Sequence, residues 1–261
     1  MFTSYFNMSH QPFCERADIN NILNDQRFER AAAKLHFMLQ GGAVALISGP
    51  TGVGKSTLIR RFVSELKQAQ TRTVYIHLTQ VKAPSLLSLI VSELGETPRR
   101  GKDRLFGQIL RKTSKDQQTT LLLIDEAHLL CDEALTDLRL MISSAMDESP
   151  PFKMILLGQE SLRRKLREEQ HADFANRISV HIKLQPLTEE QCDAYIDFQM
   201  KCAGAPEKVF EPEVKKMIHE YSSGVPRQIN NIATGCLIAA MAEKSQKINR
   251  QILHMVMDEL N

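Results

Sequence analysis

The chain has 261 residues, is 43% hydrophobic and 25% charged, and carries a formal net charge of +2, which is typical of a globular protein of about one or two domains. No basic-then-apolar leader opens the sequence, and runs such as AVALI and LLLI fall far short of the ~20 residues that a membrane span needs, so we expect neither a signal peptide nor an association with a membrane. The five cysteines are scattered and form no Cys-x-x-Cys pair, so we expect reduced thiols in a cytoplasmic protein.

Short apolar runs alternate with helical patterns along the first two thirds of the chain. The runs are AVALISG at 43–49, TVYIHLT at 73–79, TLLLIDE at 120–126, KMILLGQ at 153–159 and SVHIKL at 179–184. Segments of helical character lie between them, at 55–68, 85–95, 102–115, 132–146 and 160–175. Because strands that are apolar almost throughout are buried on both faces, the alternation predicts an α/β fold in which helices cover both sides of a parallel five-stranded sheet.

After Pro186 the helical periodicity continues to the end of the chain without strands. Thr188 and Gln191 stand in the positions of a capping box, which predicts the start of a helix. We therefore predict an α/β domain over residues 1–187, with an N-terminal extension over 1–40, and a small all-helical domain over 188–261. The helical part has 8 basic against 11 acidic residues, so the net positive charge lies in the first part, where we expect any polyanion to bind.

The segment GPTGVGKST directly follows the first predicted strand and matches the phosphate-binding pattern G-x-x-x-x-G-K-[ST]. Its glycines allow the backbone N–H groups to point inward and form an anion cradle at the start of a helix. Lys55 is expected to contact the β- and γ-phosphates of ATP, and the hydroxyl of Ser56 to ligate Mg²⁺. A ligand-free turn is the weaker alternative, because the strand and the helix that the motif requires are both present. The predicted nucleotide-binding residues of this loop are Gly49, Pro50, Thr51, Gly52, Val53, Gly54, Lys55, Ser56 and Thr57.

The segment LLLIDEAHLL at 121–130 supplies a second motif. Asp125 ends a buried strand, where ligands bind in open α/β sheets, and is expected to bind nucleotide by holding Mg²⁺ directly or through water. Glu126 could orient and deprotonate an attacking water, which would convert binding into hydrolysis. The letters DEAH also occur in helicases, but those need two full sheet domains and this chain has material for about one. An adenylate-type kinase is disfavoured, because Glu126 favours water as the acceptor.

Three further polar residues fit an ATPase. Gln159 ends the predicted strand 153–159 and could polarise the water, although a plain strand-to-helix turn explains it equally well. Arg177 lies between a helix and the last strand, and could be a surface cation or reach the γ-phosphate of a neighbouring subunit as an arginine finger. Arg227 stands at the start of a helix after Gly224 and Pro226, where the peptide dipoles favour an anion, so we expect it to contact phosphate rather than form a surface ion pair.

Taken together, these residues resemble the AAA+ ATPases over nearly the whole chain. The segment 49–57 looks like the Walker A loop of that family, and LLLIDE looks like Walker B. Gln159 is similar to sensor 1, Arg177 to the arginine finger, and GVPRQINN to the sensor 2 segment. Within the superfamily the resemblance is closest to the group containing the secretion ATPase ExeA and the transposition ATPases of the TnsC and TniB type. It is carried by the opening YF…PF, LIDEAHLL, LLGQE, NRI…L.PLTEEQ and G.PR.IN.

The resemblance implies ATP and Mg²⁺ as cofactors and a homo-oligomer, ring or filament, as the active form. The secretion type resembles a larger protein with a membrane span and a wall-binding module, whereas this sequence stops at Asn261, so we expect the transposition type. Such a protein coats double-stranded DNA without sequence specificity in its ATP form and engages a transposase and a targeting factor. A secretion accessory ATPase and a nucleotide switch that hydrolyses nothing remain as alternatives.

The segment 95–115 has seven basic residues against two acidic ones. In related DNA-bound AAA+ rings, this region faces the central channel and contacts the DNA backbone. Phosphate contacts need only positive charge within reach and carry no sequence information. The predicted DNA contacts are Arg99, Arg100, Lys102 and Arg104. A solvated helix face after a turn is the alternative for this run of charge.

Overall fold

The structure is a computed structural model that describes residues 1–14, 18–79, 82–115, 118–144, 152–206 and 208–260. The chain forms two compact units. The sheet unit consists of Arg27–Gly49 and Lys55–Leu184, and the helical unit consists of Met1–Gln26, Pro50–Gly54 and Gln185–Asn261. The sheet unit ends close to the boundary expected at residue 187, but the first 26 residues pack with the helical unit instead of the α/β domain.

The sheet unit contains a five-stranded sheet in the order β2-β3-β4-β1-β5, and all four pairings are parallel. The strands are β1 (Val44–Ser48), β2 (Thr71–His77), β3 (Thr119–Asp125), β4 (Lys153–Gly158) and β5 (Ile178–Lys183). This confirms the parallel α/β sheet that the apolar runs predict. Because the strands are parallel, their carboxyl ends all lie on the same side of the sheet. The phosphate-binding motif follows β1 and Asp125 ends β3, so both are found at these carboxyl ends.

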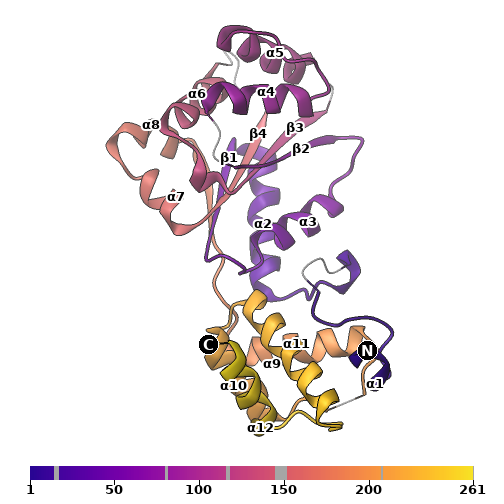
Figure 1. The fold of residues 1–261 in the computed structure, drawn as a ribbon. Coiled ribbons are helices and arrows are strands. Elements are labelled where there is room, and N and C mark those ends of the chain that lie inside the picture. The colour runs from indigo at the N-terminus through magenta and orange to yellow at the C-terminus, as the bar shows by residue number, and fades with distance from the viewer. Residues whose placement is uncertain (15–17, 80–81, 116–117, 145–151, 207, 261) are drawn as a thin grey trace. The chain divides into compact units, whose positions relative to one another are not determined.

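Helices cover both sides of this sheet (Figure 1). Helices α4, α5 and α6 pack on one side, where their apolar residues form a single core with alternate residues of the strands, and α2 and α3 lie on the other side (Figure 1). The helices of this unit are α2 (Gln26–Gly41), α3 (Lys55–Glu65), α4 (Ala83–Glu93), α5 (Lys102–Lys115), α6 (Asp132–Ser143), α7 (Glu160–Lys165) and α8 (Ala172–Ala175), with 3₁₀ turns η2 (Ala127–Leu129) and η3 (Glu169–His171).

The helix expected over 160–175 is divided into α7, η3 and α8. The backbone leaves the helical region at Glu168, whose ψ is 144°. This turn allows His171 to be buried with its Nε2 atom 3.1 Å from a carboxylate oxygen of Asp132. The expected helix at 132–146 is observed to Ser143, and residues 145–146 lie outside the described residues.

The helical unit is built on α9 (Glu189–Cys202), α10 (Pro212–Ser222), α11 (Pro226–Ala242) and α12 (Arg250–Leu260), with α1 (Phe2–Tyr5) and η1 (Ile19–Asn21) from the start of the chain. Thr188 and Gln191 form the predicted capping box in front of α9. Phe6 and Phe13 are buried in the core of this unit, which explains why the N-terminal segment packs there. In the described part of the chain, no helix combines the length and the apolar character that a membrane crossing requires.

Candidate nucleotide-binding site

The phosphate loop connects β1 to α3, so its backbone ends at the start of a helix. Gly52 and Gly54 have φ angles of 79° and 104°, in the left-handed region where side chains are strained, and this is the conformation that the glycines of the motif permit. Lys55 is only 7% exposed, and its Nζ atom donates a hydrogen bond of 2.9 Å to the carbonyl oxygen of Gly49. A buried cation is therefore held within a loop whose N–H groups can cradle an anion.

Asp125 lies at the carboxyl end of β3 and is 2% exposed. Three protein donors compensate the burial of its charge. The hydroxyl of Ser56 donates to Oδ2 at 2.9 Å, the hydroxyl of Tyr75 donates to the same oxygen at 2.8 Å, and the backbone N–H of Glu126 donates to Oδ1 at 2.8 Å. The two residues predicted to serve Mg²⁺, Ser56 and Asp125, are thus brought together from α3 and β3.

Tyr75 is a residue of this site that the sequence analysis missed. It lies on β2, in register with Leu123, while His77 is in register with Asp125. Burial, together with the carboxylate of Asp125, raises the pKa of Tyr75 above its ordinary value, so the phenol stays protonated and donates. The only signal in the sequence is a tyrosine two residues before the end of a strand, and that becomes informative only when the neighbouring strand is known.

The donors at this edge fit Mg²⁺. A serine hydroxyl and a carboxylate are hard oxygen ligands, and Mg²⁺ is commonly held by one or two such groups together with substrate phosphates and water. Among the described residues, no group of three or more His, Cys, Asp or Glu side chains could hold a metal ion by itself. Ser56 and Asp125 would therefore hold the ion jointly with the phosphates of a bound nucleotide.

Glu126 has a left-handed backbone, with φ 55° and ψ 32°, which is uncommon for a residue with a side chain. Its Oε2 atom lies 3.2 Å from Nδ1 of His128, and its side chain is partly exposed. Strained backbone of this kind costs about 1–3 kcal/mol and is concentrated at functional sites. The carboxylate of Glu126 thus directly follows Asp125, and it lies close to the imidazole of His128.

Gln159 lies at the carboxyl ends of the parallel strands, and Arg177 lies at their amino ends. Gln159 directly follows β4, the neighbour of β3, so the condition that its strand lies beside that of Asp125 is met. Arg177 is exposed and directly precedes β5, so it lies at the amino ends of the parallel strands. A strand of six residues spans roughly 20 Å, which separates Arg177 from the carboxyl ends of the strands, where Asp125 lies.

Arg227 occupies the first turn of α11 in the helical unit, which also contains residues Pro50–Gly54 of the phosphate loop. Its backbone N–H donates to the carbonyl oxygen of Gly52 at 3.3 Å. A Cβ atom on Gly52 would lie 2.7 Å from Cβ of Arg227, so a side chain there would clash. The turn before α11 is equally tight, because a Cβ on Gly224 would lie 2.1 Å from the carbonyl oxygen of Leu187.

The basic segment before and within α5 is ordered by a buried glutamine. The Nε2 atom of Gln108 donates to the carbonyl oxygen of Thr97 at 3.0 Å and to Glu96 at 3.2 Å, and its Oε1 atom accepts from the backbone N–H of Arg99 at 3.0 Å. Gln108 therefore holds the loop in place. The predicted DNA contacts Arg99, Arg100 and Arg104 are exposed, and so is Arg111 further along α5.

Lys102 differs from its basic neighbours. Its Nζ atom lies 2.8 Å from carboxylate oxygens of both Glu133 and Asp137 on α6. Hydrogen bonds to Asp137 and Glu133 raise the pKa of Lys102. The structure thus brings Lys102 to α6 as a structural cation, and leaves the exposed arginines as the uncompensated part of the predicted basic surface.

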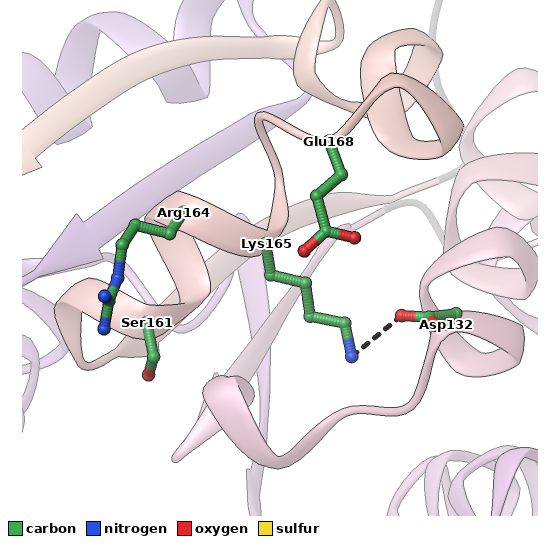
Figure 2. A pocket seen from close by; sticks show the side chains of 5 residues that line it. All are labelled: Asp132, Ser161, Arg164, Lys165 and Glu168. Atoms are coloured by element: carbon green, nitrogen blue, oxygen red, sulfur yellow. Dashed lines mark ion pairs between the residues drawn. The ribbon is translucent and has the colours of Figure 1, made fainter.

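A separate pocket on the sheet unit has balanced charges (Figure 2). It is lined by Asp132, Ser161, Arg164, Lys165 and Glu168. Lys165 reaches across it to a carboxylate oxygen of Asp132 at 2.8 Å (Figure 2) and also donates to the carbonyl oxygen of Leu130 at 2.7 Å. Hydrogen bonds from Lys165 and His171 lower the pKa of Asp132. This network joins α7 and η3 to the start of α6, and contains no residue of the phosphate loop.

Comparisons with known proteins agree with this fold. Residues 38–166 match the protein family described as AAA domain. Over 254 residues the chain is 32% identical to General secretion pathway protein A of Aeromonas hydrophila, in a match that covers 95% of this chain and 46% of that protein. The chain therefore spans about half the length of this relative.

Solved structures share the fold at low identity. Cdc6p from Pyrobaculum aerophilum matches with a TM-score of 0.74 and 18% identity, over 98% of this chain and 70% of that one. The Orc1 protein of Aeropyrum pernix in complex with DNA matches with a TM-score of 0.71 and 16% identity, over 93% and 67%. The RuvB Holliday junction branch migration motor of Thermotoga maritima matches with a TM-score of 0.62 and 20% identity, over 92% and 70%.

Proposed function

We propose, from the premise that the chain has the AAA+ P-loop fold and carries an AAA domain over residues 38–166, that it hydrolyses ATP and uses the cycle to control self-association on DNA. The observation that carries the first half is the buried Asp125, which accepts a hydrogen bond from Ser56 while Glu126 follows it directly. A phosphate loop alone would bind nucleotide. The adjacent carboxylates of Asp125 and Glu126 add a metal ligand and a general base, both of which a reaction with water requires.

Each residue of the site has a part in this proposal. The loop N–H groups and Lys55 bind the phosphates. Ser56 and Asp125 would hold the Mg²⁺ ion that is bound to these phosphates. Bound Mg²⁺ would supply neutralisation of the charge that develops on the phosphate oxygens. Glu126 takes the proton of the attacking water, and Gln159 holds that water from the neighbouring strand.

The position of Arg177 supports self-association. Because it lies at the amino ends of the parallel strands, away from Asp125 at their carboxyl ends, it serves the site of a neighbouring copy, as an arginine finger supplied in trans. Assembly and hydrolysis are then coupled. Within the helical unit, the backbone N–H of Arg227 donates to the carbonyl oxygen of Gly52 in the phosphate loop, which supports Arg227 as a phosphate contact.

DNA is the proposed partner of the exposed arginines before and within α5. Their loop is preorganised by Gln108, and phosphate contacts need only charge at a suitable position. The occurrence of a similar fold in an Orc1 protein solved in complex with DNA supports this choice. In the full proposal, the ATP-bound oligomer forms in the cytoplasm, coats double-stranded DNA without sequence specificity, and recruits a transposase and a targeting factor.

A second candidate function is a secretion accessory ATPase. The 32% identity to General secretion pathway protein A over 95% of this chain favours it. In that case the same nucleotide site would drive an assembly that is indifferent to DNA. A nucleotide switch without turnover is the third possibility, and it would leave Glu126 without a catalytic part.

One set of measurements separates these functions. DNA binding is measured over a range of salt concentrations with ATP, ADP and a slowly hydrolysed ATP analogue, and ATP hydrolysis is measured with and without duplex DNA. The proposal requires tight, salt-sensitive DNA binding in the triphosphate states only, and hydrolysis that responds to DNA. Turnover that ignores DNA supports the secretion function, and binding of ATP without turnover supports the switch.

A further inference from the structure

The oxygen atoms of Asp125 accept more hydrogen bonds from the protein than the sequence motif implies. An ionised carboxylate has about four lone-pair positions. Oδ2 accepts from both Ser56 and Tyr75, and Oδ1 accepts from the backbone N–H of Glu126. Both positions on Oδ2 are therefore occupied by protein donors, and one position remains, on Oδ1.

The contact of Tyr75 is specific to its hydroxyl. Tyr75 as a whole is 45% exposed, so it does not serve as a buried apolar filler, yet its hydroxyl lies 2.8 Å from Oδ2. β2 is at the edge of the sheet, and Tyr75 reaches from it along the face shared with Asp125. An exposed tyrosine with its hydroxyl bonded to a buried carboxylate is the arrangement expected of an orienting group.

We propose that Tyr75 is a positioning residue for the metal site: its hydroxyl holds Oδ2 of Asp125, and so fixes the orientation in which the carboxylate would present its remaining position on Oδ1 to Mg²⁺ or to a water bound to it. This inference rests on the proposed ATPase function and deepens it. Direct coordination through Oδ2 would require the loss of a bond to Ser56 or Tyr75. The ion, or a water bound to it, would therefore be met by the free position on Oδ1, whose direction depends on how Tyr75 and Ser56 hold the carboxylate.

The test is Tyr75→Phe in the full chain, which removes the hydroxyl and keeps the ring. Binding of Mn²⁺, as a paramagnetic substitute for Mg²⁺, is measured by electron paramagnetic resonance in the presence of ADP. Affinity for a fluorescent ADP analogue is measured separately in EDTA, without metal. Because groups that orient a metal ligand typically contribute 10- to 100-fold to metal affinity, we expect the dissociation constant of Mn²⁺ to rise about tenfold while metal-free ADP affinity is unchanged.

A kinetic readout distinguishes positioning from a general defect. For Tyr75→Phe the Mg²⁺ concentration that gives half the maximal ATPase rate should rise by about the same factor of ten, and kcat at saturating Mg²⁺ should change much less. Tyr221→Phe is the matched control, because Tyr221 is an exposed tyrosine on α10 of the helical unit. It should leave both quantities at their wild-type values.

The possible outcomes separate this inference from the proposed function. Unchanged Mn²⁺ affinity in Tyr75→Phe, with wild-type protein that hydrolyses ATP, overturns the positioning role and leaves the ATPase intact. Equal losses of metal-free ADP affinity and Mn²⁺ affinity show a structural role only, and also overturn it. Wild-type protein that binds neither the ADP analogue nor Mn²⁺ overturns the ATPase proposal and this inference together.

Discussion

The backbone N–H of Arg227 donates a hydrogen bond to the carbonyl oxygen of Gly52, at 3.3 Å, so the first turn of α11 lies directly against the phosphate loop. The contact is close because Gly52 has no side chain. This relationship connects Arg227, which the sequence predicts to contact phosphate, with a glycine of the phosphate-binding motif.

Gly52→Ala should impair nucleotide binding. The φ of 79° is unfavourable for alanine by roughly 1–2 kcal/mol, and the added Cβ would meet Cβ of Arg227 at 2.7 Å. We expect affinity for a fluorescent ATP analogue to fall at least several-fold. Gly41→Ala is the matched control, since a Cβ at Gly41 meets nothing within 4 Å. Wild-type affinity in Gly52→Ala would show that the loop can move away from Arg227 at little cost.

Glu126→Gln should separate ATP binding from hydrolysis. The amide keeps the size of the side chain but cannot take a proton from water, so we expect kcat to fall by roughly 10²–10⁴ while ATP affinity is retained. Under the proposed function this variant stays bound to DNA in ATP, which a filter-binding assay measures. Glu220→Gln, at an exposed position on α10, is the control and should behave as wild type. Near-normal turnover in Glu126→Gln would assign the general base to another group.

Arg177 can be tested by mixing two inactive variants. Arg177→Ala and Glu126→Gln should each lose most ATPase activity, because each lacks one group of a site shared between copies. An equimolar mixture should recover roughly a quarter of the wild-type rate, because random assembly unites the two intact groups at about one interface in four. If Arg177 instead served its own chain, the mixture would stay inactive. Steady-state phosphate release, measured at a protein concentration that supports assembly, decides between the two.

The exposed arginines and Lys102 should differ in their contribution to DNA binding. Each phosphate contact contributes about 0.9 to the slope of log affinity against log salt concentration, so Arg99→Ala with Arg104→Ala should reduce that slope by about 2. Lys102→Ala should leave the slope unchanged, because its charge is compensated by Glu133 and Asp137. An equal reduction of the slope by Lys102→Ala would show that the ion pair opens to meet DNA.

Lys102→Ala should instead lower thermal stability. It leaves the carboxylate of Asp137, whose side chain is 5% exposed, without its cation. Because Lys102 itself is substantially exposed, we expect a moderate loss of about 2 kcal/mol in the free energy of unfolding. Calorimetry of Lys102→Ala beside Arg100→Ala, which removes an exposed basic side chain from the same loop, measures the difference.

Features encoded by contiguous residues could be predicted from the amino-acid sequence alone. The apolar runs fixed the five strands because a strand buried on both faces needs apolar side chains throughout. The phosphate loop and the capping box of Thr188 and Gln191 were equally readable, since their chemistry is completed within a few positions of the chain. Asp125 could be placed at a ligand-binding edge for the same reason: it directly ends its strand.

Only the tertiary structure decided which side chains meet across that framework. The bond from Tyr75 to Asp125 depends on β2 and β3 being neighbours in a particular register, and periodicity within one strand carries no such information. Phe6 packs in the helical unit, and Lys102 reaches Glu133, through contacts between distant parts of the chain. The sequence pattern within one element indicates which of its residues are buried. Which side chain each of them contacts follows from the arrangement of whole elements in space.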